Sequence, residues 1–78
     1  MKFVATCYTH LAALRTARAL EAAGAAAALA PVPRALSSSC GTCVCYEGTD
    51  PLLERMDQDV EAVYRQTGTG YACLMKNE

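Results

Sequence analysis

Three of the five cysteines in this 78-residue chain fall within six residues, and the thiol is the side chain best able to do covalent chemistry here. A cysteine reacts as its thiolate, so a working cysteine needs neighbours that favour the anion. Arg34 can supply positive charge to Cys40, and Gly41 allows backbone amides to turn inward around an anion. Hydroxyl donors stand beside Cys40 at Ser37, Ser38 and Ser39. The loop therefore predicts Cys40 as the reactive sulfur; the alternative is an ordinary polar turn, although exposed free thiols are usually avoided unless they are used.

Cys43 and Cys45 raise two further hypotheses. Cys40 and Cys43 form a Cys-x-x-Cys pair, in which Cys43 could resolve a persulfide or close a disulfide, although this pair enters a strand whereas the redox motif usually begins a helix. The three cysteines could instead be zinc ligands, but a structural zinc site normally uses a second well-spaced pair. A free cysteine is also a common small core residue, and we expect most of the five to be only that.

Hydrophobic periodicity predicts the elements that position this loop. A period of two predicts a strand that places Cys43 and Cys45 on one face, and Asp50-Pro51 is typical of a helix start. The expected order is a strand at 2–8, a helix between Thr9 and Gly24, strands at 25–30 and 42–46, a helix from Asp50 to Gly68, and a strand at 71–75. Pro31 and Pro33 lack amide hydrogens, which places the strand at 25–30 at a sheet edge.

This order predicts an α+β fold, a ferredoxin-like βαββαβ sandwich in which two helices cover one face of a four-stranded antiparallel sheet. Residues 1–78 would form a single domain. In that topology the connections at 7–10, 34–41 and 67–70 meet at one end of the sheet. Cys7 would then approach Cys40, and His10 could tune the Cys40 thiol, although a core role for Cys7 and a solvated His10 are the simpler interpretations.

Residues 31–41, Pro-Val-Pro-Arg-Ala-Leu-Ser-Ser-Ser-Cys-Gly, resemble the signature of a bacterial family of small selenium/sulfur (Se/S) carrier-like proteins. The resemblance implies that Cys40 is the carrier thiol, with Arg34 and the serines around it. Such a protein accepts a sulfane sulfur or selenium atom from a donor such as a cysteine desulfurase, delivers it to an acceptor enzyme, and needs no resident cofactor. It is a carrier rather than an enzyme with turnover. Cys43 and Cys45 depart from the family, in which aliphatic strand residues are more usual.

The composition of the chain limits the classes of partner that we expect. The net charge is −1 and no basic cluster appears, so we expect no nucleic-acid partner. The first residues carry neither a signal peptide nor a membrane span, and we expect a cytoplasmic protein with reduced thiols. Much of the 53% hydrophobic content is alanine, so the core is thin and a homodimer would strengthen it. A small zinc-binding or dimeric interaction module, with the cysteines as ligands or core, is the alternative function.

Overall fold

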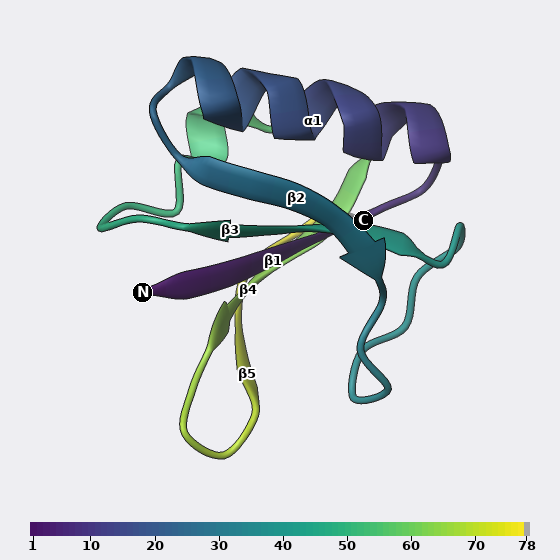
Figure 1. Ribbon diagram of the computed structural model, residues 1–78. Helices are drawn as coiled ribbons and strands as arrows, with labels where there is room; N and C mark the ends of the chain where they lie inside the picture. The colour runs from purple at the N-terminus through teal and green to yellow at the C-terminus, as the bar shows by residue number, and fades with distance from the viewer. Residues whose placement is uncertain (78) are drawn as a thin grey trace.

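A single α-helix packs on a five-stranded antiparallel sheet in the computed structural model, which describes residues 1–77 (Figure 1). The elements are β1 (Lys2–Cys7), α1 (His10–Ala22), β2 (Ala26–Pro31), β3 (Thr42–Glu47), the 3-10 turn η1 (Leu53–Arg55), β4 (Val60–Gln66) and β5 (Tyr71–Lys76). The order across the sheet is β2-β3-β1-β4-β5. This places β1 at the centre of the sheet, with β2 and β5 at the two edges.

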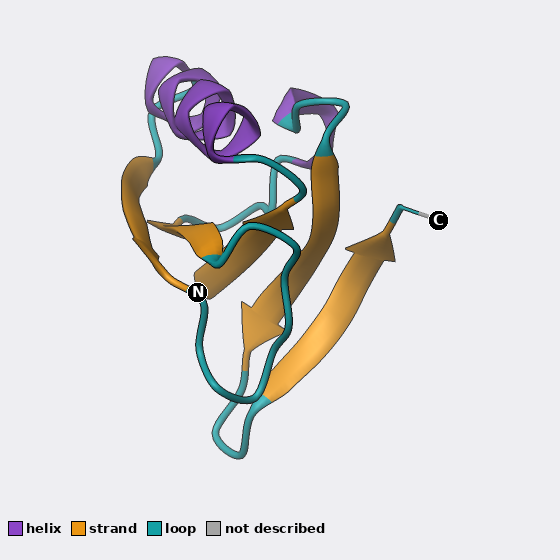
Figure 2. Ribbon diagram, turned by 90° about the vertical axis from the view of Figure 1, so that its right-hand side faces the viewer, coloured by secondary structure: helices purple, strands orange, loops and turns teal. Residues whose placement is uncertain are grey.

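The core lies between α1 and the sheet face beneath it (Figure 2). Alternation along β1 turns Phe3, Ala5 and Cys7 toward this core. The ring of Phe3 stacks on that of Tyr46, with the ring centroids 5.2 Å apart. Because the apolar side of the helix is built largely from alanine, it can lie close to the sheet, and the larger side chains of the strands fill the space.

The predicted boundaries of the first helix are confirmed. The hydroxyl of Thr9 accepts a hydrogen bond from the amide of Ala12 at 3.0 Å and so caps the helix. Gly24 adopts a φ of +92°, a conformation that a glycine takes without strain, just beyond the end of the helix. No helix within residues 1–77 is long and apolar enough to cross a membrane.

The arrangement of the first three strands also agrees with the prediction. β3 pairs antiparallel with both β1 and β2. The alanine-rich strand β2 is an edge strand that ends at Pro31. Proline has no amide hydrogen, and at the end of an edge strand the sheet loses no backbone hydrogen bond because of it. Cys43 and Cys45 lie on one face of β3, with their Sγ atoms 3.9 Å apart.

The predicted helix from Asp50 to Gly68 is wrong, and with it the four-stranded sheet covered by two helices. Asp50 Oδ1 accepts a hydrogen bond from the amide of Leu52 at 2.7 Å, but Leu52 has a φ of +54°, which a continuing right-handed helix cannot accommodate. Only the short turn η1 follows, and the chain then becomes β4 between β1 and β5. Val60 and Val63 both face the core on the helix side, because a bulge in the pairing of β4 with β1 leaves one extra residue between them. Their spacing of three residues on one face therefore imitated a helical stripe.

The expected meeting of three connections at one end of the sheet is therefore only partly correct. In the antiparallel pairing of β1 with β4, Phe3 lies opposite Arg65 and Cys7 lies opposite Val60. The turn at 67–70 thus lies at the end of the sheet where β1 begins, far from the end where Cys7 lies. The segment before β4 takes its place, because the amide of Tyr8 donates to the carbonyl of Asp59 at 2.9 Å.

Candidate functional site

Cys40 lies in the loop between β2 and β3, at the end of the sheet where β1 finishes. Its side chain is half-buried and packs against the core on the helix side. The thiol donates to the carbonyl oxygen of Cys7 at 3.2 Å and to that of Thr42 at 3.4 Å. Both contacts use the proton of the sulfur, so both are lost when that proton is replaced by another atom.

The backbone of this loop is fixed at both of its ends. Val32 donates its amide hydrogen to the carbonyl of Gly41 at 3.2 Å, which closes the base of the loop. Gly41 has a φ of +74°, and this requirement for a left-handed residue directly after Cys40 explains the glycine. The hydrogen bond at the base of the loop and the glycine after Cys40 therefore fix the backbone that carries the thiol.

Serine and glutamate contacts tie the loop to the central strands. The hydroxyl of Ser38 donates to the carbonyl of Cys7 at 2.9 Å, and the amide of Ser39 donates to Glu61 Oε1 at 3.3 Å. The register between β1 and β4 shifts between Thr6 and Cys7, as at a bulge, which re-aims backbone groups at a strand end. The Cys7 carbonyl thus accepts from both Ser38 and Cys40, and it is the anchor of the site.

We expect Ser38→Ala to raise the rate at which a thiol reagent labels Cys40 by about fivefold, because the loop loses one anchoring hydrogen bond of roughly 1 kcal/mol. The measurement is the labelling rate at neutral pH, followed by peptide mass. Ser37→Ala is the matched control, since Ser37 is exposed and its hydroxyl makes no hydrogen bond within residues 1–77. An unchanged rate in Ser38→Ala would contradict the anchoring role.

Of the polar side chains predicted around Cys40, Arg34 is exposed to solvent and His10 contacts a neighbouring side chain. Arg34 is exposed, and no ion pair or hydrogen bond joins its guanidinium to another side chain within residues 1–77. His10 lies on the same end of the sheet, with Nδ1 3.4 Å from Thr42 Oγ1. The groups in contact with the Cys40 sulfur are backbone carbonyls, so a partner that brings its own donors would complete any stabilisation of an anion there.

The two fully buried cysteines are poor nucleophiles. Burial raises the pKa of the Cys7 thiol to about 12, and the nearby Cys40, Asp57 and Glu61 act in the same direction. Burial also raises the pKa of Cys43 to about 12, helped by the adjacent Cys45. Because a thiol reacts as its thiolate, both sulfurs should attack a disulfide or persulfide slowly near neutral pH.

Cys40 and Cys43, which the sequence predicts as a pair, lie on opposite faces of the sheet. Cys40 packs against the helix-side core, whereas Cys43 lies beside Cys45 on the opposite face, with its Sγ 3.6 Å from the carbonyl of Pro31. Cys73 is exposed on the edge strand β5. In the part of the chain that the structure describes, no three His, Cys, Asp or Glu side chains are grouped closely enough to hold a metal ion. The three cysteines considered as zinc ligands therefore do not form such a group.

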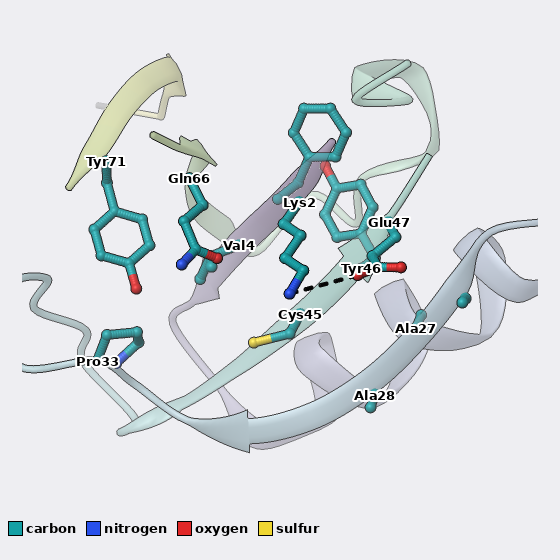
Figure 3. A pocket seen from close by; sticks show the side chains of 12 residues that line it. Lys2, Val4, Ala27, Ala28, Pro33, Cys45, Tyr46, Glu47, Gln66 and Tyr71 are labelled. Carbon is teal, nitrogen blue, oxygen red and sulfur yellow. Dashed lines mark ion pairs between the residues drawn. The ribbon is translucent and has the colours of Figure 1, made fainter. Parts of the chain in front are cut away.

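A groove of about 430 Å³ crosses the sheet face opposite the helix, and sequence reasoning missed it (Figure 3). The side chains of Val4, Ala28 and Cys45 form its floor. Its walls come from the 32–41 loop, through Pro33, and from the β4–β5 hairpin, through Tyr71; both project away from α1 (Figure 1). The only feature of the sequence that pointed to this groove was the shared face of Cys43 and Cys45. The hairpin wall could not be foreseen, because a helix was predicted for the residues that form β4.

Comparison with known proteins gives one finding. A family model described as "Putative Se/S carrier protein-like" matches residues 2–65, which run from β1 almost to the end of β4. No curated protein and no solved structure matches the chain. The matched region contains Cys7, Cys40, Cys43 and Cys45 and leaves out Cys73.

Proposed function

We propose, from the premise that this chain belongs to the Putative Se/S carrier protein-like family, that it carries a sulfane sulfur or selenium atom on Cys40. The observation that carries the proposal is the placement of this thiol. Cys40 is the one cysteine that lies outside a strand, and it is half-buried in a loop anchored at the Cys7 carbonyl. Cys7 and Cys43 are fully buried thiols, and Cys73 lies outside the family match.

The transfer is a thiol exchange in which atoms and charge balance. The Cys40 thiolate attacks the outer sulfur of a donor persulfide, a bond forms between these two sulfurs, and the donor leaves as its thiolate. An acceptor thiolate then attacks the outer sulfur of the Cys40 persulfide and restores Cys40. Selenium follows the same route with selenium as the outer atom. We propose a cysteine desulfurase or a comparable donor, an acceptor enzyme, and a cytoplasmic setting in which thiols stay reduced.

The contacts of Cys40 support a difference between the empty and loaded forms. In the empty form the thiol proton is donated to the carbonyls of Cys7 and Thr42. In the loaded form that proton is replaced by the cargo atom, so both hydrogen bonds are lost, while Ser38 keeps its bond to Cys7. The loaded sulfur is therefore held less firmly, which helps an acceptor to reach the cargo.

Mass spectrometry of the loaded wild-type protein tests this proposal. The chain is incubated without oxygen with a cysteine desulfurase and cysteine, its thiols are blocked, and it is digested with trypsin. Cleavage after Arg34 and Arg55 leaves Cys40 on the peptide 35–55 with the cysteines of β3, so fragmentation must separate them. We expect a single added sulfur on Cys40. An added sulfur on Cys45, or on the peptide 66–76 that carries Cys73, would overturn the proposal.

The homodimer expected from the thin core stays a prediction. Its physical reason remains, because the edge strands β2 and β5 leave backbone groups without a neighbouring strand. Alanine side chains occupy much of β2, so association along this edge would rest on backbone hydrogen bonds more than on apolar burial.

A further inference from the structure

The thiols of Cys43 and Cys45 form a pair that the carrier chemistry does not use. They are two residues apart on β3, they face the same side of the sheet, and their Sγ atoms are 3.9 Å apart. Cys43 is fully buried, and Cys45 is half-buried on the floor of the groove. The pair is thus a dithiol with one member open to solvent through the groove.

Strand geometry works against a disulfide within this pair. Each residue advances a strand by about 3.3 to 3.4 Å, so the Cβ atoms of Cys43 and Cys45 lie about 6.7 Å apart. A disulfide needs Cβ atoms about 3.5 to 4.5 Å apart. Closing that bond would require β3 to bend in the middle of its ladders with β1 and β2. The sulfurs are therefore close to each other but protected from mutual oxidation.

The same spacing suits one ion held between the two sulfurs. A metal–thiolate bond is about 2.3 Å long, so two such bonds span up to about 4.6 Å. The observed 3.9 Å falls within that reach without movement of the strand. We propose that Cys43 and Cys45 bind one soft, thiophilic monovalent cation of the Cu(I) class at the floor of the groove.

The surroundings favour Cu(I) over Zn(II). A structural zinc ion takes four ligands, usually in a tetrahedral arrangement, and no third His, Cys, Asp or Glu joins the pair within residues 1–77. Thiolate ligands select Cu(I) because both partners are soft, and this ion accepts a low coordination number. The open side of the groove leaves space for a further thiolate from solution.

The charge that the filled site would carry is small. Two thiolates and one Cu(I) carry a net charge of −1, since binding displaces both thiol protons to solvent without any change in oxidation state. Lys2 extends into the groove near Cys45, where it pairs with Glu47 at 3.8 Å (Figure 3). Its ammonium group lies on the solvent side of the site, beside the Glu47 carboxylate that offsets its charge.

The test measures Cu(I) binding without oxygen, in competition with a chromophoric Cu(I) chelator. The parent protein carries Cys40→Ser and Cys73→Ser, which removes the loop thiol and the exposed thiol. We expect it to bind one equivalent of Cu(I). Cys45→Ser in this background should lower the affinity by about tenfold or more, because losing a ligand costs at least as much as losing a group that orients one.

Two further variants keep the test decisive. Cys43→Ala should weaken binding to a similar extent, whereas Cys7→Ala is the matched control, a buried strand thiol on the opposite face that should leave the affinity unchanged. If Cys43→Ala does not fold, Cys45→Ser decides the question alone. Parent-like affinity in Cys45→Ser, an equal loss in Cys7→Ala, or tighter binding of Zn(II) than of Cu(I) would overturn the proposal.

Discussion

Replacing Cys40 with serine should abolish sulfur loading, so that the variant gains no sulfur under conditions in which the wild-type chain gains one. The serine hydroxyl is close in size to the thiol and can still donate to the carbonyl of Cys7, which accepts from Cys40 at 3.2 Å. The variant therefore keeps its loop but has no nucleophilic sulfur there. Intact mass after incubation with a cysteine desulfurase and cysteine measures the result.

Cys73→Ser and Cys45→Ser are the controls for this loss. Cys73 is exposed on β5 and Cys45 is half-buried on β3, so both sulfurs can be reached by reagents without belonging to the Cys40 loop. Each control should load as the wild type does. Equal loading of Cys40→Ser and the wild type would remove Cys40 from the carrier role, whatever the state of the metal site proposed at Cys43 and Cys45.

Stability should fall steeply above pH 9, by about 1.4 kcal/mol per pH unit for each buried thiol that must stay neutral. Burial raises the pKa of Cys7 from its ordinary value of 9.0 to about 12, with Cys40, Asp57 and Glu61 adding to the rise. The stabilising contribution is complete below pH 9, where the unfolded thiol is also protonated. It is lost as the pH rises toward 12, because the unfolded chain releases a proton that the folded chain retains.

Other buried groups act in the same direction. Burial raises the pKa of Cys43 to about 12, so the two thiols together give roughly 3 kcal/mol per pH unit. Burial also raises the pKa of the Tyr46 hydroxyl, which donates to the carbonyl of Pro51 at 2.6 Å. Small domains have free energies of unfolding of about 5–15 kcal/mol, so such a slope would unfold this chain within a few pH units.

Urea unfolding under reducing conditions, from pH 7 to 10.5, measures this slope. Cys7→Ala removes one of the two thiols and should reduce the slope by about 1.4 kcal/mol per pH unit, even if it lowers stability at pH 7 by creating a cavity. Cys73→Ala, at an exposed position, should leave the slope unchanged. A slope in Cys7→Ala equal to that of the wild type would show that Cys7 does not contribute.

The position of the candidate site in the fold could be predicted in part, because it depends on local signals. The serine-rich loop, its glycine and the cysteine within it are consecutive in the sequence, and the neighbouring strands were assigned correctly. The contact of Cys40 with Cys7 follows from β3 lying beside β1. The role of Ser38 could not be predicted, because its hydroxyl donates to the backbone of Cys7 instead of facing the sulfur.

What the sequence determined by itself is the first half of the fold, from β1 to β3. Each of these elements carries its own local signal: alternation in the strands, a threonine cap at Thr9, and a glycine at position 24 that ends the helix. Only the tertiary structure decided the second half. The apolar spacing of Val60 and Val63 fits a helix or a bulged strand, in which an extra residue turns both side chains to one face. The edge of β1 resolved the choice, because backbone hydrogen bonds and burial together favour β4 there. The groove and its dithiol follow from that choice, since the β4–β5 hairpin supplies one wall.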